Sequence, residues 1–325
     1  MNCLKKSLLR GTAIAICAAL AACGGSNSPG ATATTTSTGG TTPSASPTTM
    51  SASVSSLVLS VNDTGTNAAL TGTPRTITFT NTGSAAVVDF QVATTPALPT
   101  GTTTSSTCGA TIAVGSSCTY TITPGSTPSA AVGDTNAAPL VLSASGSNAT
   151  AVNVAVSVLG YGSVYQAGYV FSIDDTTAAT GSIGGTVLQQ SDVTFGAVWS
   201  PDETLNASSL TDGSGNSSTI VAALGTLSGY AAPLCTQVTD GGYTDWYLPA
   251  IDELDGGSQS AFTTLLPLGV PAATTSEYYW SSTEVNAAEA DSVHVGGVLT
   301  SATLSEAALN KSQGFGVRCA RAMTN

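Results

Sequence analysis

The segment Asp245–Leu254, with the sequence DWYLPAIDEL, constrains the C-terminal half of the chain more than any other stretch. A strand-like apolar pair follows Trp246 and leads directly into Pro249. Proline is favoured at the first position of a helix, because the N–H that it lacks would have no partner there. Ile251 and Leu254 are three residues apart and therefore lie on one helix face. The segment predicts a strand, a helix beginning at Pro249 and a core that both elements share.

Glu253 follows Pro249 by four residues and lies on or beside this buried face. A carboxylate in such a place needs a partner, so we expect an ion pair with Arg318 or Arg321. A role as a general acid is the alternative, although buried carboxylates with shifted pKa values are often structural. The structural core of this half is predicted to contain Trp246, Pro249, Glu253, Trp280 and Arg318.

The charge balance excludes several classes of partner. Only 8% of the 325 residues are charged, and three of the seven basic residues fall in the first ten positions. The remaining chain has four basic against 19 acidic residues, a formal charge of 4 − 19 = −15. Such a chain cannot neutralise phosphates, which excludes nucleic acid as a partner. Sulfated polysaccharide is disfavoured for the same reason.

Residues 1–22 are typical of a signal peptide, with a basic start and an apolar run too short to span a bilayer. The run ends in Leu-Ala-Ala-Cys, which resembles the bacterial lipobox. The resemblance implies a lipid on Cys23 that attaches the chain to the membrane. The glycine after Cys23 implies the outer membrane or cell surface. An ordinary signal peptide that ends near an unmodified cysteine is the alternative.

Residues 23–52 begin with the lipidated cysteine and contain no charge. Their Gly, Ser, Thr, Ala and Pro cannot build a core, so they predict a flexible tether. The expected layout is multidomain, with the anchor and tether followed by two folded regions.

Residues 53–159, which we call the β module, alternate apolar and polar residues in short runs divided by turn residues. This pattern predicts an all-β sandwich. The motifs TCG (107–109) and VGSSCTYTI (114–122) resemble bacterial immunoglobulin-like domains of the ASH/hydin type. The resemblance implies a disulfide between Cys108 and Cys118, and a role as spacer or platform.

Four cysteines remain beyond Cys23. An even number in an exported chain predicts disulfides. A zinc site is the alternative, but the sequence has a single histidine and no C-x-x-C pair. The four residues are Cys108, Cys118, Cys235 and Cys319.

Residues 160–325, which we call the head, contain all three tryptophans. Helices are expected at 218–224, 232–238 and 258–266, and strands at the two ends of the region. Mixed short helices and strands with long loops are typical of an α+β domain.

Four motifs of the head resemble the Lcl C-terminal domain family, named for the collagen-like adhesin of Legionella. The resemblance implies a C-type-lectin-like fold, pairing of the first and last strands, and a disulfide between Cys235 and Cys319. Ala167 departs from the family, which usually has glycine there. The positive charge that the adhesin needs for sulfated glycans is absent here. The motifs are VYQAGYVF (164–171), GGYTDWYLP (241–249), YWSSTE (279–284) and VRCAR (317–321).

The resemblance also places candidate ligand contacts near Trp280, where C-type-lectin-like folds carry ligand loops. Aromatic rings and hydroxyls there are suited to a glycan, while Trp246 and Trp280 themselves are expected in the core. The candidates are Tyr278, Tyr279, Ser281, Ser282 and Glu284.

Asp240 and Asp245 flank a Gly-Gly turn and are candidates for a Ca²⁺ site, since calcium prefers oxygen ligands. A solvated acidic loop is the alternative, and the lectin calcium motifs Glu-Pro-Asn and Trp-Asn-Asp are missing. No other cofactor is expected. His294 has no nucleophile-elbow pattern beside it, so the chain is not expected to be an enzyme.

These features predict a surface-exposed bacterial lipoprotein that recognises or adheres to a glycan or a protein through the head. The alternative is a structural envelope protein that self-assembles or binds a neighbouring envelope component. A hydrolase is a third possibility. The sequence leaves open the ligand, the oligomeric state and the side of the envelope that the head faces.

Overall fold

The structure is a computed structural model that describes residues 45–226 and 229–324. The predicted signal peptide, Cys23 and the first part of the tether lie outside these residues. All described residues belong to one compact unit, Ser44–Asn325. No helix among them is long and apolar enough to cross a membrane. The chain is mostly β, with a helical segment between residues 213 and 268.

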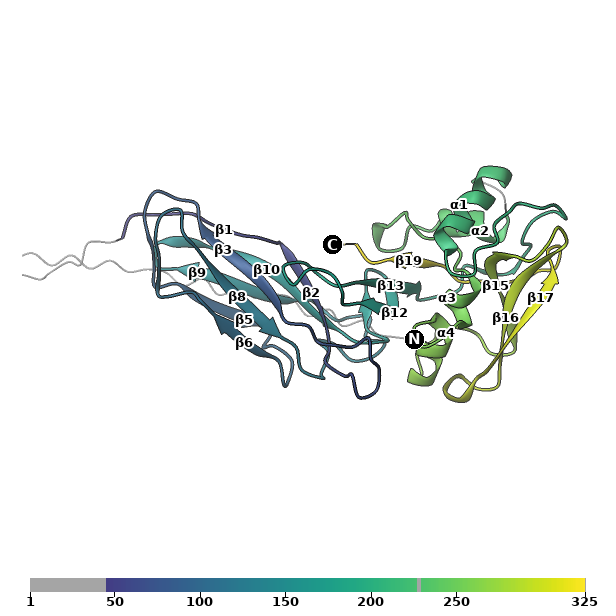
Figure 1. Ribbon diagram of the computed structural model, residues 1–325, viewed down its shortest axis with the longest axis horizontal. Helices are drawn as coiled ribbons and strands as arrows, with labels where there is room; N and C mark the ends of the chain where they lie inside the picture. Colours follow the sequence, from purple (N-terminus) through teal and green to yellow (C-terminus); the bar gives the residue numbers. More distant parts are fainter. Residues whose placement is uncertain (1–44, 227–228, 325) are drawn as a thin grey trace, which may run out of the picture. The chain divides into compact units, whose positions relative to one another are not determined.

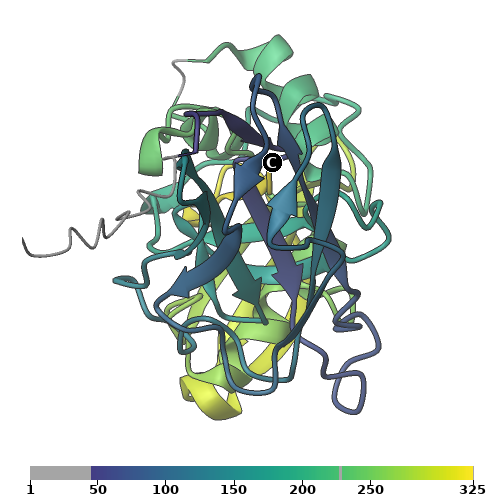
Figure 2. The same cartoon turned by 90° about the vertical axis from the view of Figure 1, so that its left-hand side faces the viewer.

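Two four-stranded sheets form the β module and share one core (Figure 1). Figure 2 gives a second view, with the β module facing the viewer. The alternation expected from the sequence is present, since every second residue of Arg75–Asn81 is buried. One sheet has the order β1 (Met50–Ala52), β3 (Arg75–Asn81), β8 (Ser117–Thr123), β6 (Thr103–Ser106). The other has the order β2 (Ser56–Ser60), β10 (Ala149–Leu159), β9 (Leu140–Gly146), β5 (Gln91–Thr95), and β4 (Val87–Val88) pairs with β7 (Thr111–Ile112).

The predicted tether ends earlier than residue 52. Strand β1 pairs with β3, and Thr48 is buried with its hydroxyl donating to the Ala85 carbonyl at 2.7 Å. These hydrogen bonds give a short polar segment a place in the sheet that its composition does not predict.

The head contains two further sheets. The last strand, β19 (Ala320–Ala322), pairs with β13 (Gly184–Gln189), and β13 separates it from β12 (Gly168–Asp174). The implied direct pairing of the first and last strands is therefore wrong by one strand. The smaller sheet has the order β11 (Val164–Tyr165), β12 (Gly168–Asp174), β13 (Gly184–Gln189), β19 (Ala320–Ala322). The larger has the order β14 (Thr194–Ala197), β18 (Phe315–Val317), β15 (Glu277–Glu284), β16 (Glu289–Gly296), β17 (Thr303–Asn310).

Four short α-helices contact these strands, with α1 and α3 packed against β15 (Figure 1). Helix α1 begins earlier than predicted, because the Asp212 carboxylate accepts a hydrogen bond from the Gly215 N–H at 2.7 Å and caps it. The helices are α1 (Gly213–Leu224), α2 (Ala231–Thr236), α3 (Ile251–Asp255) and α4 (Ala261–Leu265). Single 3₁₀ turns lie at η1 (Asp240–Gly242), η2 (Leu266–Leu268) and η3 (Leu299–Ser301).

The expectation that a helix begins at Pro249 is wrong. Helix α3 begins at Ile251, and the Pro249 carbonyl accepts a hydrogen bond from the Ser282 N–H of β15 at 2.8 Å. The proline therefore ends the preceding extended segment and ties it to the sheet. Its burial in the core is confirmed.

The segment 175–183, which joins β12 to β13, hydrogen-bonds to both sheets of the β module. The Ile183 N–H donates to the Val58 carbonyl on β2 at 3.0 Å. The Thr76 N–H on β3 donates to the Ala179 carbonyl at 2.8 Å. A hairpin loop of the head thus shares backbone hydrogen bonds with β2 and β3.

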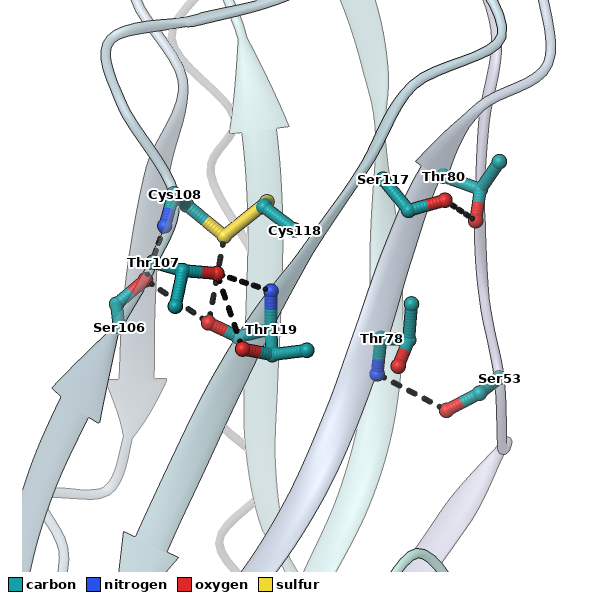
Figure 3. Close-up of a disulfide and its surroundings, with 9 residues drawn as sticks. All are labelled: Ser53, Thr78, Thr80, Ser106, Thr107, Cys108, Ser117, Cys118 and Thr119. Atoms are coloured by element: carbon teal, nitrogen blue, oxygen red, sulfur yellow. Dashed lines mark hydrogen bonds between the residues drawn. A yellow bond between two sulfur atoms is a disulfide. The ribbon is translucent and has the colours of Figure 1, made fainter.

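Both predicted disulfides are present. Cys108 is joined to Cys118 of β8, and Figure 3 shows the neighbouring Thr119 N–H donating to the Thr107 hydroxyl at 2.9 Å. Cys235 in α2 is joined to Cys319, 84 residues away, between β18 and β19. The second bridge ties the helical segment to the C-terminal strands.

Candidate functional site

Every lysine and arginine in the described part of the chain is buried in an ion pair with a carboxylate. The nitrogen–oxygen distances are 2.6–2.7 Å, and none of the four basic side chains is more than 5% exposed. Most of the 19 acidic residues have no such partner. The described surface is therefore neutral to acidic. The pairs are Arg75–Asp175, Lys311–Glu284, Arg318–Asp192 and Arg321–Asp245.

The expected ion pair between Glu253 and Arg318 or Arg321 is wrong. The Glu253 carboxylate instead accepts hydrogen bonds from the Ala250 N–H at 2.8 Å, the Gly213 N–H at 3.0 Å and the Tyr247 hydroxyl at 2.8 Å. The first N–H groups of a helix have no partner within it, and Glu253 serves the starts of both α1 and α3. Burial raises the pKa of Glu253, and these three hydrogen bonds oppose the rise.

Trp246 and Trp280 lie in the core as predicted. The Trp280 indole N–H donates to the Ala197 carbonyl at 2.8 Å. Arg318 is also buried, where it donates to the Asp192 carboxylate at 2.7 Å and to the Pro271 carbonyl at 2.5 Å. The core role of these three residues agrees with the expectation, although the partner of Arg318 differs.

Of the five predicted ligand contacts, Tyr278 alone is partly exposed. All five belong to β15, a strand with a neighbour on each side, β18 and β16, and the other four are buried within it. A ligand at the surface of this structure would reach Tyr278 but not the other four. The buried residues are Tyr279, Ser281, Ser282 and Glu284.

The contacts of the Glu284 carboxylate give this residue a structural role. Burial raises the pKa of its carboxyl, but hydrogen bonds from Lys311 and from the Leu205 and Asn206 N–H groups lower it below its usual value. These donors lie 2.6–2.7 Å away. Lys311 also lies over the ring of Trp199, 4.8 Å from its centroid. The carboxylate therefore holds the segment around Leu205 against the sheet.

The two aspartates proposed for calcium have protein partners. The Asp245 carboxylate accepts two hydrogen bonds from the Arg321 guanidinium, at 2.7 and 2.9 Å, and Asp240 accepts one from Gln189 at 2.7 Å. Within 45–226 and 229–324, no three His, Cys, Asp or Glu side chains are grouped to hold a metal ion. The structure gives no support to a calcium site at these residues.

Tyr278, which the sequence predicts as an aromatic ligand contact, belongs to an aromatic row on the larger sheet of the head, and its neighbours in that row, His294 and Phe315, were not expected there. The ring of Tyr278 lies 4.6 Å from that of His294 and 5.2 Å from that of Phe315, and all three are partly exposed. Tyr278 is opposite His294 in the register of β15 and β16, so their side chains share a face. Phe315 also contacts the buried Trp280 at 4.7 Å, which anchors the row in the core.

Comparison with known proteins adds little to this description. No family model matches the chain, so neither family resemblance is confirmed, and no curated protein matches it. A fimbrial protein from Bacteroides ovatus is 12% identical, with a TM-score of 0.35 over 75% of each chain. Two structures of the surface-layer protein SbsC are 13% and 14% identical, with TM-scores of 0.23 and 0.25. The matches span 43% and 45% of this chain, and each spans 19% of the SbsC chain. Similarity at this level assigns no function.

The two disulfides indicate the compartment. Disulfides persist in oxidising environments and are rare in the cytosol. Both bridges therefore indicate an extracytoplasmic protein.

Proposed function

We propose that this chain is a bacterial surface lipoprotein, lipidated at Cys23, that recognises a glycan or a protein through the head without catalysis. In this proposal the β module is an immunoglobulin-like spacer and the head is C-type-lectin-like. The observation that carries the proposal is the aromatic row of Tyr278, His294 and Phe315, which is partly exposed on a surface without basic side chains among the described residues.

The chemistry of the row suits a neutral ligand. Aromatic rings offer a large apolar face and a polar edge, which match the faces and hydroxyls of a sugar ring or an apolar peptide side chain. His294 is opposite the exposed Ser305 of β17, which adds a hydroxyl beside the rings. Like charges across an interface disfavour binding, so the acidic surface selects against sulfated, phosphorylated and other anionic ligands.

The support beneath the row is rigid. Phe315 rests on Trp280, and the Trp280 indole is hydrogen-bonded to the backbone of Ala197. The Cys235–Cys319 bridge closes the chain a few residues after Phe315. A preorganised surface loses less entropy when it binds, which favours recognition by a fixed patch over binding by a loop that must first be ordered.

The test is an array of neutral and anionic glycans and of extracellular proteins, probed with the full chain and with Tyr278→Ala. We expect the full chain to bind a neutral glycan or a protein on the array, and we expect Tyr278→Ala to lose that binding. Tyr120→Ala changes a partly exposed tyrosine of β8 and serves as the matched control, with retention unchanged.

Three outcomes would contradict the proposal. One is that the chain binds nothing on the array, and another is binding that Tyr278→Ala leaves intact. The third is turnover of a bound glycan that is lost in Glu284→Gln, since this would make the chain a hydrolase. A stable oligomer measured by light scattering without ligand, together with a silent array, would instead favour the structural envelope protein.

A further inference from the structure

Strand β17 is the last strand of the larger sheet of the head, and among the described residues it has a neighbouring strand on one side only (Figure 1). It pairs with β16 along its whole length, from Thr303 to Asn310, without a bulge. Natural proteins protect exposed edges with proline, lysine, bulges or very short strands. The sequence of β17, TLSEAALN, has no proline and no lysine, so its free edge is available to a further strand.

The direction of the backbone groups of β17 follows from the residue just after it. The Lys311 N–H donates to the Ala288 carbonyl, which precedes β16, at 2.9 Å. Opposite residues of antiparallel strands alternate between hydrogen-bonded and non-hydrogen-bonded pairs. Counting back from Lys311, every second residue of β17 therefore directs its N–H and C=O to β16, and the residues between direct them away from the sheet. The outward residues are Leu304, Glu306, Ala308 and Asn310.

The side chains of the outward residues lie on the face of the sheet that packs against α3 and α4. Leu304 is opposite Val295, and Glu306 is opposite Val293. Both valines belong to the core cluster that contains residues of these two helices. In a strand added to this edge, the residues opposite Leu304 and Glu306 would place their side chains on the same face.

A pocket of about 240 Å³ lies on this face at the start of β17. Its lining includes Leu304 and Ala302, which are partly exposed, and the exposed Pro267. A side chain opposite Leu304 in an added strand would lie beside this pocket, which has room for one apolar side chain.

Carboxylates lie beside the pocket along the same edge. Glu306 is exposed on β17, and Asp291 lies on the same face of β16. Asp255 of α3 accepts a hydrogen bond at 2.8 Å from the hydroxyl of Thr263, which lines the pocket. Burial raises the pKa of Glu306, and the charges of Asp255, Asp291 and Asp252 raise it further. All four basic side chains of the described chain are paired elsewhere, so this group of carboxylates has no countercharge.

We infer that the free edge of β17 binds an extended segment of a partner protein, which adds to the sheet as a further strand and carries an apolar and a basic side chain two residues apart. The apolar side chain enters the pocket beside Leu304, and the lysine or arginine faces Glu306. Backbone hydrogen bonds supply affinity in this mode of recognition, and the alternate side chains supply specificity. A second copy of this chain is a poor occupant, because two β17 edges would bring like carboxylates together.

This site goes beyond the proposed function. His294 alternates with Val293 and Val295 along β16, so the aromatic row lies on the opposite face of the sheet. Binding at either place can therefore be lost without the other.

The experiment probes an array of capped peptides, each about as long as β17, with the full chain. Every peptide has threonine, a strand-forming residue, at all positions but two. These two positions lie two residues apart and are varied through every amino acid. We expect the strongest binding where one is a large apolar residue and the other is lysine or arginine. The same peptides with aspartate or glutamate in place of the basic residue should not bind.

Ala308→Pro tests the edge itself. It removes an outward N–H, which proline can replace on an edge strand without loss of a sheet hydrogen bond. The best peptide should bind at least about tenfold more weakly, measured by fluorescence anisotropy. Thr104→Pro, at an outward position of the edge strand β6, is the matched control and should bind normally. Melting temperatures check that both variants are folded.

Glu306→Gln tests the choice of a basic partner and does not depend on how Ala308→Pro folds. It should weaken the best peptide about threefold, as expected for an exposed ion pair, and reduce the preference for lysine on the array. Asp89→Asn removes one exposed carboxylate of the β module and should leave the affinity unchanged.

Several results would overturn the inference. They are an array on which no peptide binds, equal binding of basic and acidic peptides, and unchanged binding by a folded Ala308→Pro. A dimer in solution that Ala308→Pro dissociates would assign the edge to a second copy. If Tyr278→Ala abolishes peptide binding and Ala308→Pro does not, the aromatic row is the peptide site, and the proposed function stands without the edge. Peptide binding at the edge with no binding to the glycan and protein array would instead refute the proposed function alone.

Discussion

At the scale of single residues, Ala167 occupies a backbone conformation that suits glycine. Gln166 and Ala167, in the turn between β11 and β12, have φ values of 47° and 66°. Both central residues of such a tight hairpin turn need positive φ. The departure of this position from glycine, visible in the sequence, therefore corresponds to a strained turn in the structure.

Ala167→Gly should stabilise the protein by about 0.5–1 kcal/mol, because glycine adopts positive φ without the steric cost that alanine has. Urea unfolding at constant slope measures the change. Ala222→Gly, at an exposed position inside α1, is the control and should destabilise by about 1 kcal/mol. Destabilisation by both substitutions would show that the turn is not strained.

Glu253→Leu should lower the free energy of unfolding by at least about 3 kcal/mol. The substitution leaves the Gly213 and Ala250 N–H groups and the Tyr247 hydroxyl without their acceptor, and each buried unsatisfied group costs about 1–3 kcal/mol. Glycan or protein retention by the folded fraction should not change. Asp252→Asn, one residue away, should have an effect within about 0.5 kcal/mol. Equal melting temperatures for Glu253→Leu and the wild type would contradict the assigned role.

The sequence predicted the burial of the tryptophans and of Pro249 better than it predicted the partners of the polar residues. Large aromatics such as Trp246 and Trp280 have few stable locations other than a core. The partner of Glu253, by contrast, depends on two helices beginning side by side, and nothing in the spacing between Asp212 and Pro249 reports that. Tyr278 was predicted as an aromatic ligand contact, but its neighbours in the row were missed for a similar reason, because Phe315 reaches Tyr278 only through the pairing of β18 with β15.

At the scale of elements, the loop between β12 and β13 is the feature that joins the head to the β module. Arg75 is fully buried on β3 and pairs with Asp175 at 2.6 Å, and it also donates to the Ala178 carbonyl at 2.9 Å. Asp175 accepts further hydrogen bonds from the Ser60 and Thr71 hydroxyls. The sequence shows a short polar loop here, and its hydrogen bonds to both sheets of the β module are a tertiary property.

Asp175→Asn should destabilise the protein by about 3–5 kcal/mol at pH 7, because it leaves Arg75 buried without a countercharge. Burial raises the pKa of Asp175, but hydrogen bonds from Ser60, Thr71 and Arg75 outweigh it and hold the pKa below the usual 3.8. Asp174→Asn, at the exposed neighbouring position, should cost far less.

The pH dependence follows from the sign of this shift. A carboxyl with a lowered folded-state pKa stabilises the fold above its unfolded pKa, and this contribution is lost as the pH falls through the folded value. The free energy of unfolding of the wild type should therefore fall from pH 4 downwards, and the Asp175→Asn curve should be flatter there. Parallel curves for the two proteins would contradict the ion pair.

Element boundaries were predicted well where alternation was strong and poorly where a cap or a break decides them. Strands β3 and β8 match their alternating runs. Helix α1 begins in a Gly- and Ser-rich stretch that owes its helicity to the Asp212 cap. The strand predicted at the C-terminal end of the head is divided into β18 and β19, since Arg318 and Cys319 turn inward to their partners between them.

At the scale of the whole molecule, the two disulfides should differ in what they contribute. Closing a loop restricts the unfolded chain more when the loop is longer. With separations of 84 and 10 residues, removal of Cys235–Cys319 by double alanine substitution should cost about 4–5 kcal/mol, against about 3 kcal/mol for Cys108–Cys118. Denaturant unfolding of the two double variants compares them directly. A larger loss from the short loop would contradict this ranking.

The distribution of charge over the whole molecule also bears on its function. Each of the four basic residues beyond the predicted leader is itself buried in an ion pair, and none is left for the surface that the structure describes. The negative net charge could be counted in the sequence, and it is the reason why nucleic acid was not expected as a partner. The sequence could not show that all four basic side chains would be buried, because burial of a charge depends on where its carboxylate partner lies.

The account rests on recognition that uses neutral contacts, and the salt dependence of binding tests this most directly. The dissociation constant of the full chain for the tightest-binding neutral glycan of the array should be measured at about 0.02 M and about 0.5 M salt, concentrations between which charge–charge attraction is largely screened. The account predicts a change of less than about twofold. A roughly tenfold or greater weakening at high salt would show that charge pairing drives binding and would contradict it.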